Sequence, residues 1–155
     1  MDRWSEQELE GWGRYPRIAA LAARPERRRD VTDALCDRDG APSLAYGMGR
    51  SYGDAALLRD GRVIRTERLD RILGFEPATG WLRCEAGVSL KALIDLFVPR
   101  GFFPPVVPGT QFVSVGGAIA NDIHGKNHHI DGSFGDHIRQ LELLTASGDI
   151  VTCDA

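Results

Sequence analysis

Apolar residues recur at helical spacing near the middle of the chain, at Leu90, Leu93, Ile94 and Phe97. These positions correspond to i, i+3, i+4 and i+7, the apolar stripe of an amphipathic helix. Ser89 stands just before the stripe, where its hydroxyl can accept a hydrogen bond from an unpaired amide of the first turn. Pro99 and Gly101 follow the stripe and predict that the helix ends there.

Short apolar stretches bounded by turn residues predict strands on both sides of this helix. Two pairs of stretches predict hairpins, 72–76 with 81–85 and 138–145 with 150–152. Single strands are predicted over 43–46 and 63–66, and short helices over 31–36 and 115–120. Short strands, hairpins and a few helices together indicate an α+β fold.

The length and composition of the chain are those of one globular domain. It has 155 residues, 43% of them hydrophobic, which is enough for a hydrophobic core. A net charge of -3 gives no electrostatic reason to expect a nucleic-acid partner. The three cysteines, Cys36, Cys84 and Cys153, are widely spaced and form no CxxC pair. This pattern argues against a disulfide framework or a structural zinc site and indicates a reducing compartment.

The start of the sequence shows no targeting segment. Residues 1–6 lack the basic and then apolar order of a signal peptide. No apolar run approaches the ~20 residues that span a bilayer. We therefore expect a cytoplasmic protein, with peripheral contact at the inner face of the membrane left open. The sequence stops at Ala155 inside a predicted strand, so we expect a domain that is truncated at its C-terminus.

Two clusters near the N-terminus receive structural interpretations. The aromatic residues Trp4, Trp12 and Tyr15 are interpreted as packing residues without chemistry, because large aromatic side chains are usually buried. A basic cluster, Arg24, Arg27, Arg28 and Arg29, stands next to Glu26 and Asp30, which is typical of a solvated helix face; a phosphate site is the alternative.

A glycine-rich loop, YGMGRSYGD (46–54), follows the predicted strand 43–46. Glycines at alternating positions let successive amide N–H groups point into one concavity, an anion nest. Arg50 adds a permanent positive charge and Ser51 a hydroxyl donor. The spacing differs from the GxGxxG of Rossmann folds. Taken alone, the loop is equally compatible with a plain turn after a strand.

A second glycine-rich loop, PGTQFVSVGGA (108–118), precedes a predicted helix. Gly116 and Gly117 stand where that helix starts, so we expect their N–H groups to be unpaired and to carry the positive end of the helix dipole. Two separated anion loops in one small domain favour a ligand with two linked phosphates, a dinucleotide.

With both loops in place, the chain resembles the FAD-binding domain of the vanillyl-alcohol-oxidase / p-cresol-methylhydroxylase (PCMH) type flavoproteins. The resemblance rests on GMGRSYGD (47–54) followed by PGTQFVSVGGAIANDIHGKNHHIDGSFGDHI (108–138), and 116–137 is its specific part. It implies a PCMH-type domain of two small α/β subdomains over 1–155, incomplete here, with the substrate domain absent from this sequence.

The resemblance also implies which residues hold FAD. One side of the cofactor would be held by Gly47, Gly49, Arg50, Ser51, Tyr52 and Gly53. The other side would be held by Gly109, Ser114, Val115, Gly116, Gly117, Asn121, Asp122 and His124. Several relatives attach FAD covalently through a histidine in the first loop. This loop contains no histidine, so we predict a non-covalent flavin.

Within the family, the chain is most similar to members that oxidise the 2′-hydroxyl of polyprenylphosphoryl-β-D-ribose. The resemblance therefore implies an FAD-dependent oxidoreductase that acts on a secondary alcohol of a sugar in the synthesis of cell-wall arabinan precursors. A partner reductase would complete the epimerisation. The alternative is an FAD-binding fragment or module without turnover of its own.

The histidines clustered in 124–137 allow a different interpretation. With nearby aspartates they have the right ligand types for zinc or iron, and a metal-dependent hydrolase is the alternative function. However, the spacing does not match HExxH, and Lys126 places a cation inside the supposed site, so we predict no metal. His124 and Lys126 are instead the candidates for residues near the flavin, where Lys126 would favour developing negative charge. A structural histidine and a solvent-exposed lysine remain the alternatives.

Overall fold

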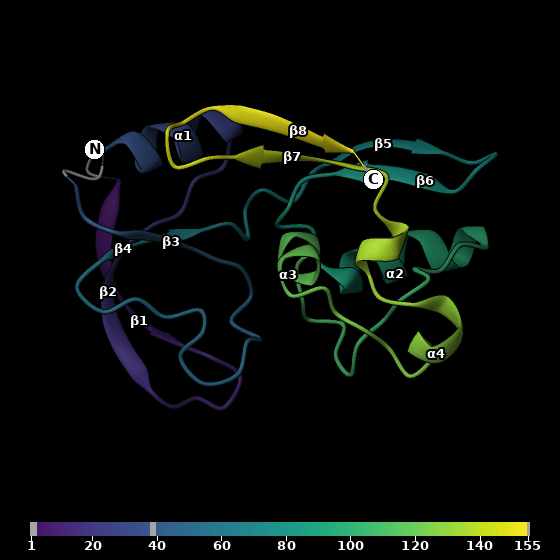
Figure 1. Ribbon diagram of the computed structural model, residues 1–155, viewed down its shortest axis with the longest axis horizontal. Coiled ribbons are helices and arrows are strands. Elements are labelled where there is room, and N and C mark those ends of the chain that lie inside the picture. The colour runs from purple at the N-terminus through teal and green to yellow at the C-terminus, as the bar shows by residue number, and fades with distance from the viewer. Residues whose placement is uncertain (1–2, 38–39, 155) are drawn as a thin grey trace.

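The computed structural model describes residues 3–37 and 40–154, so Met1, Asp2 and Ala155, on which the expectations for the two ends rest, lie outside it. The chain folds into two lobes (Figure 1). The first lobe (3–66) contains one helix and a four-stranded sheet, and the second (72–138) contains the remaining helices and a hairpin. This arrangement confirms the α+β class and the expected pair of subdomains.

The first lobe is built on a mixed sheet with the strand order β1-β2-β4-β3. Its strands are β1 (Trp4–Glu10), β2 (Arg17–Ala23), β3 (Ser43–Tyr46) and β4 (Arg62–Arg65), and its helix is α1 (Arg28–Cys36). β1 pairs with β2 in antiparallel fashion, whereas β4 is parallel to both β2 and β3. Alternate residues of β2 are buried because successive side chains point to opposite faces of the sheet.

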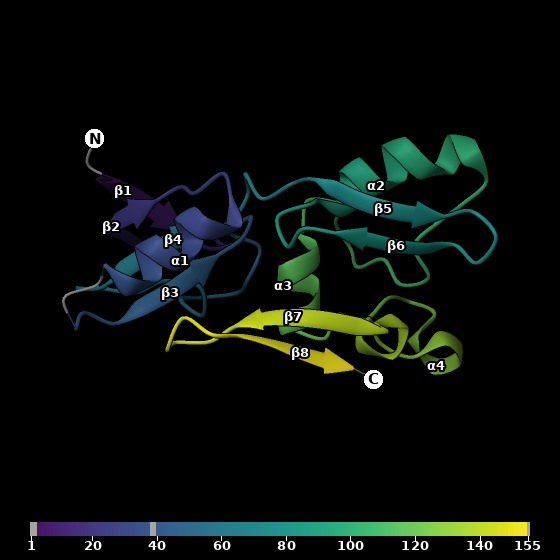
Figure 2. The same ribbon diagram turned by 90° about the horizontal axis from the view of Figure 1, so that it is seen from above.

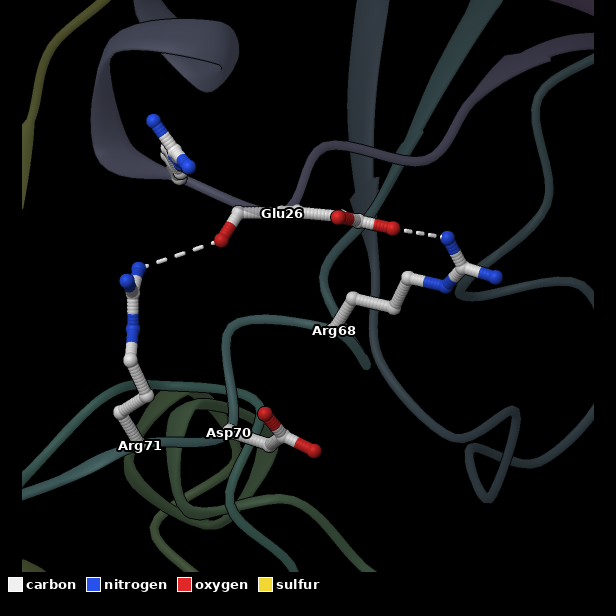
Figure 3. Close-up of a pocket in the computed structure, with 5 residues that line it drawn as sticks. Glu26, Arg68, Asp70 and Arg71 are labelled. Carbon is white, nitrogen blue, oxygen red and sulfur yellow. Dashed lines mark hydrogen bonds and ion pairs between the residues drawn. The ribbon is translucent and has the colours of Figure 1, made fainter.

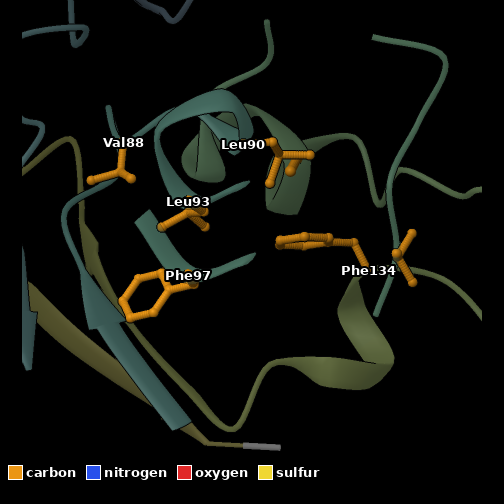
Figure 4. Close-up of a cluster of buried hydrophobic side chains, with 7 residues drawn as sticks. Val88, Leu90, Leu93, Phe97 and Phe134 are labelled. Atoms are coloured by element: carbon orange, nitrogen blue, oxygen red, sulfur yellow. The ribbon is translucent and has the colours of Figure 1, made fainter. Parts of the chain in front are cut away.

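The second lobe begins with the predicted hairpin of β5 (Ile72–Glu76) and β6 (Trp81–Cys84). It continues with α2 (Leu90–Phe97), η1 (Val98–Arg100), α3 (Val115–Ala120), α4 (His128–Asp131) and η2 (Gly135–His137). The Oγ of Ser89 accepts a hydrogen bond from the amide of Ala92 at 3.1 Å, which confirms the predicted N-cap. Three residues of the predicted stripe, Leu90, Leu93 and Phe97, belong to a buried cluster that also contains Val88, Val106, Ala118 and Phe134 (Figure 4).

A last hairpin, β7 (Gln140–Leu144) with β8 (Ile150–Asp154), extends from the second lobe to α1 (Figures 1 and 2). Glu142 on β7 lies 3.2 Å from the Arg28 guanidinium of α1 and 3.7 Å from the Arg83 guanidinium of β6. The turn at Gly148 packs beside the Cys36 sulfur at the end of α1. The hairpin therefore contacts both lobes.

The sequence patterns predicted most elements of the second lobe and missed two strands of the first. β1 and β2 were not predicted, because β1 has only two apolar residues and β2 is rich in alanine, which favours helices. The helix α1 begins earlier than predicted, β4 and β7 are shorter or shifted, and α4 was not predicted. None of the described helices has the length and apolar run needed to cross a bilayer.

Candidate functional site

The two glycine-rich loops, far apart in the sequence, lie next to each other at Ser114. A Cβ atom on Gly47 would come within 2.6 Å of the Ser114 Oγ. The same Oγ accepts a hydrogen bond from the amide of Gly117 at 3.2 Å, as the N-cap of α3. Ser114 itself is buried. α3 lies on the side of the second lobe that faces the first lobe, so the loops meet between the lobes (Figure 1).

The backbone of the first loop presents a run of N–H donors that have no acceptor within the described part of the chain. None of the amide N–H groups of 47–54 donates a hydrogen bond to any other described residue. Gly49 and Gly53 have φ values of 63° and 56°, a region that favours glycine. Successive unpaired amides in a loop with left-handed residues can form a nest for an anion. The first loop therefore has the donors expected of a phosphate site.

The turn between β1 and β2 supports this loop from outside. The amide of Trp12 donates to the carbonyl of Ser51 at 2.9 Å. A Cβ on Gly11 would come within 2.8 Å of the carbonyl oxygens of Ser51 and Gly53, so only glycine allows this approach. The hydroxyl of Tyr46, at the end of β3, donates to the carbonyl of Glu10 at 2.7 Å. These contacts fix the loop at both ends.

The side chains of the first loop point to different surroundings. The Arg50 guanidinium lies 5.7 Å from the centroid of the Trp12 ring and donates to the carbonyl of Met48 at 2.9 Å. Tyr52 is exposed over 81% of its surface. Trp12 and Tyr15 are also exposed, at 50% and 83%, so the prediction that all three N-terminal aromatic residues are packed is wrong for them. Trp4 alone is buried, as predicted.

The second loop corrects the prediction that its glycine amides are unpaired. The amide of Val115 donates to the carbonyl of Val88 at 2.8 Å, and that of Gly116 to the carbonyl of Ala86 at 2.7 Å. The amide of Gly117 donates to the Oγ of Ser114. The reason is that the start of α3 docks on the backbone between β6 and α2. Gly116 is needed there because a Cβ would come within 2.8 Å of the Ala86 Cβ.

Two polar residues after α3 form hydrogen bonds with the backbone of the chain itself. The side-chain amide of Asn121 donates to the carbonyl of Gly117 at 2.8 Å, which caps the end of the helix. The carboxylate of Asp122 accepts from the amide of Gly135 at 2.8 Å. This hydrogen bond, followed by one from Ser133, holds the pKa of Asp122 below its usual value. Asp122 closes the segment 122–135, which carries His124 and Lys126.

Gly109 of the second loop and Lys126 of the segment 122–135 are both exposed. A Cβ on Gly109 would meet nothing within 4 Å. The exposure of Lys126 agrees with the alternative of a solvated lysine and also with a group open to a ligand.

The histidines lie along one segment but do not converge on a common point. The ring centroids of His124 and His128 are 5.4 Å apart, and those of His128 and His129 are 5.8 Å apart. His128 and His137 each have a ring nitrogen at a backbone carbonyl, of Gly125 at 3.0 Å and of Asp131 at 2.8 Å. Within 3–37 and 40–154, no three His, Cys, Asp or Glu residues are placed to hold a metal ion. The hydrolase alternative therefore lacks a ligand set here.

A shallow hollow of about 370 Å³ lies at the junction of the lobes, lined by Glu26, Arg27, Arg68, Asp70 and Arg71 (Figure 3). Arg68 pairs with the carboxylate of Glu26, and Arg71 donates to the Glu26 carbonyl at 3.1 Å. The Arg71 guanidinium also forms a bidentate salt bridge with the buried carboxylate of Glu85, with N···O distances of 2.8 and 3.0 Å. The contacts of Arg68 and Arg71 with Glu26 connect the lobes here, and no residue of the two glycine loops lines the hollow.

The sequence did not reveal that Gly11 and Trp12 contact the first glycine loop. It also did not reveal that Arg71 and Glu85 form an ion pair at the junction of the lobes. The sequence Gly11-Trp12-Gly13 was an available signal, because a tryptophan between two glycines is typical of a turn rather than of a core. No local pattern links Arg71 with Glu85.

Comparison with known proteins gives a family match over most of the chain. A sequence model described as FAD binding domain matches residues 19–154. The chain is 45% identical over 148 residues to the decaprenylphosphoryl-beta-D-ribose oxidase of Mycolicibacterium smegmatis, which covers 93% of this chain and 32% of that protein.

Two further relatives are dehydrogenases. The D-lactate dehydrogenase of Anaerostipes hadrus is 26% identical over 142 residues, 86% of this chain and 30% of that protein. The D-2-hydroxyglutarate dehydrogenase of Escherichia coli is 31% identical over 106 residues, 68% of this chain and 10% of that protein. The chain thus spans a third or less of the length of each of these three relatives.

Proposed function

Because this chain belongs to the family of FAD-binding domains, we propose that it is the cofactor-binding part of an FAD-dependent oxidoreductase that acts on a secondary alcohol. The observation that supports this function best is the run of amides over 47–54 that have no acceptor among the residues the structure describes, located where the second glycine loop approaches. A phosphate of the FAD diphosphate is the kind of anion that a run of free loop amides can bind.

The two glycine-rich loops differ in how many free N–H groups they offer to the phosphates of FAD. The first loop offers unpaired amides, the Arg50 charge and glycines that allow close approach of a bulky group. The second loop cannot offer the amides of 115–117 without giving up the contacts described above. Gly117 and its neighbours would instead shape the wall of the site. We propose the predicted set of cofactor residues on this basis, with the first loop as its main anion-binding part.

When bound, FAD supplies a two-electron acceptor, which takes a hydride from the carbon that bears the alcohol. The chain's own residues bind and orient this group. His124 and Lys126 lie on the segment 122–135, whose shape depends on the Asp122–Gly135 hydrogen bond. The Lys126 ammonium, which is exposed, would stabilise negative charge on a bound group.

The substrate that we propose is a polyprenyl-phosphate-linked ribose, oxidised at its 2′-hydroxyl in the synthesis of an arabinan precursor. The support is the 45% identity to a decaprenylphosphoryl-ribose oxidase. The hydroxy acids named in the two dehydrogenases are also secondary alcohols, so the shared chemistry is oxidation of a CH–OH group. A lipid-linked substrate favours peripheral contact with the inner face of the membrane, and a partner reductase would consume the keto product.

An absorption spectrum of the purified chain, followed by anaerobic addition of substrate, tests this function. Bound FAD should give a flavin spectrum, and the full-length oxidase should bleach with polyprenylphosphoryl ribose but not with D-lactate. Bleaching with D-lactate alone would favour a hydroxy-acid dehydrogenase instead. Binding of FAD without bleaching by any alcohol would favour the alternative of a module without turnover.

The non-covalent attachment of FAD is tested separately. The first loop contains no histidine, and His124 lies in the segment 122–135, which is closed by the Asp122–Gly135 hydrogen bond. Acid precipitation should release the yellow chromophore into the supernatant. Colour that stays in the protein pellet would contradict this prediction.

A further inference from the structure

We propose that Trp12 is a positioning residue of the cofactor site, which holds the Arg50 guanidinium over the first glycine loop without neutralising its charge. The inference rests on the proposed role of that loop in binding the FAD diphosphate. It assigns a role to the β1–β2 turn, which the sequence interpretation treated as packing.

The geometry places an aromatic face under a cation. The Arg50 guanidinium carbon lies 5.7 Å from the centroid of the Trp12 ring, within the ~6 Å at which a cation is attracted to the ring. One guanidinium nitrogen donates to the Met48 carbonyl at 2.9 Å, so the side chain folds back over its own loop. The remaining N–H groups have no acceptor among the described residues.

An aromatic partner holds the Arg50 guanidinium without neutralising its positive charge, as a carboxylate partner would do. Other arginines of the first lobe are held by carboxylates, as Arg17 is by Glu10 and Arg24 by Glu67. In the described part of the chain, no carboxylate lies within ion-pair distance of Arg50, whereas the indole face holds it and leaves its charge uncompensated. An uncompensated, oriented guanidinium is the group that pairs with a phosphate.

The backbone of Trp12 is hydrogen-bonded to the first glycine loop. Its amide donates to the Ser51 carbonyl at 2.9 Å, one residue after Arg50. Gly11 allows the turn to approach the carbonyls of Ser51 and Gly53. The indole and the guanidinium are thus fixed on two backbones joined by a hydrogen bond, so a ring at position 12 sets the direction of Arg50.

The test measures FAD binding by the chain, through quenching of flavin fluorescence, in the wild type and in Trp12→Leu, Trp12→Phe, Arg50→Gln and the double variant Trp12→Leu/Arg50→Gln. Trp12→Leu should weaken binding about three- to tenfold, the range of a cation–π contact. Trp12→Phe keeps a ring face and should stay within about twofold of the wild type. The double variant should bind as weakly as Arg50→Gln alone, because Trp12 acts through Arg50.

The chain offers a matched control in a second Trp–Arg pair. The Arg139 guanidinium lies 5.8 Å from the Trp81 ring centroid, on the β5–β6 hairpin of the other lobe. Trp81→Leu removes the same kind of contact and should leave FAD affinity unchanged. A loss equal to that of Trp12→Leu would show that the effect is general destabilisation and would overturn the inference.

Two further results would also overturn it. One is wild-type affinity in Trp12→Leu; the other is additive losses in the double variant, which would mean that Trp12 acts on the loop independently of Arg50. These outcomes leave the proposed function intact, provided that the wild type binds FAD. Failure of the wild-type chain to bind FAD rejects the proposed function and this inference with it. A lower salt dependence of binding in both Trp12→Leu and Arg50→Gln than in the wild type would support the inference, because both lose an oriented charge.

Discussion

The Ser114 hydroxyl occupies the space that a side chain on Gly47 would need, with its oxygen 2.6 Å from the position of a Cβ there. This relationship joins the first glycine loop of one lobe to the N-cap of α3 in the other. Gly47→Ala should push the loops apart and weaken FAD binding about tenfold, because overpacking a close contact typically costs 1–3 kcal/mol. Titration of flavin fluorescence measures the loss.

A second substitution controls for this steric explanation. Ser114→Ala removes the oxygen and would leave the nearest side-chain atom, the Ser114 Cβ, at 3.8 Å from the new methyl group. Gly47→Ala/Ser114→Ala should therefore bind FAD better than Gly47→Ala alone, although it loses a helix cap of about 1 kcal/mol. Equal weakness of the two variants would contradict the explanation.

The core of the second lobe should be sensitive to the size of Leu90. This side chain is fully buried against the cluster shown in Figure 4. Leu90→Ala should lower the free energy of unfolding by about 2–5 kcal/mol, the range for cavities at buried leucines. Leu96→Ala on the exposed side of α2 is the matched control and should cost about 0.5 kcal/mol. Urea denaturation measures both, and equal losses would contradict the packing described.

The junction pair should make stability depend on pH in the acid range. Burial alone would raise the pKa of Glu85, but the hydrogen bonds and the charge of Arg71 outweigh it and hold the pKa below its usual value. A lowered folded-state pKa means that the contribution is present above the unfolded value of about 4.3 and is lost as pH falls through the folded value.

Glu85→Gln isolates this contribution. The variant should be less stable by about 1–2 kcal/mol at pH 7, since a charge-assisted hydrogen bond is replaced by a neutral one. The difference in thermal midpoint from the wild type should shrink as pH falls below about 4. A difference that does not change between pH 7 and pH 3 would mean that the ionised carboxylate is not the stabilising form.

The cysteines should differ in reactivity. Burial, with the nearby charge of Glu85 adding to it, raises the pKa of the Cys84 thiol to about 11, whereas Cys36 and Cys153 are exposed. Because the thiolate is the reactive form, iodoacetamide at pH 8 should label Cys36 and Cys153 in the native chain and Cys84 only after denaturation. Peptide mass mapping checks the sites, and rapid native labelling of Cys84 would contradict its burial.

The segment that carries His124 and Lys126 should loosen when its closing hydrogen bond is removed. Asp122→Ala takes away the acceptor of the Gly135 amide, so hydrogen exchange at Gly135 should become faster. Asp122→Asn is the matched control, because its amide oxygen can still accept and asparagine tolerates the positive φ of 40° at this position. Exchange in the asparagine variant should stay close to that of the wild type.

The sequence predicted elements whose signals are local. Ser89 and the stripe of Leu90, Leu93 and Phe97 specify α2 within a few residues, and the turn residues between 76 and 81 specify the β5–β6 hairpin. β1 was missed because its pairing with β2, and not its own pattern, makes it a strand. Its polar residues face solvent, and the strand is stabilised by its partner.

The sequence predicted which residues form the two loops of the candidate site, but not which of their amides are hydrogen-bonded within the chain. The two loops could be recognised from their glycines, but glycine has two uses here that a sequence does not separate. Gly116 allows α3 to dock on Ala86, whereas Gly49 allows a left-handed turn in the loop with unpaired amides. The difference depends on which backbone lies opposite each residue, and that is set by the packing of the lobes. The Trp12–Arg50 contact depends on the same packing.

The β7–β8 hairpin also sets an order of events while the chain is being synthesised. Glu142 contacts Arg28 and Arg83, and the turn at Gly148 reaches Cys36, so this hairpin can connect the lobes only once the ribosome has released it. The glycine loops of 47–54 and 108–118 emerge earlier and can already meet at Ser114. In a nascent chain the lobes are therefore not yet joined along this side when both loops have been synthesised, and the hairpin connects them afterwards.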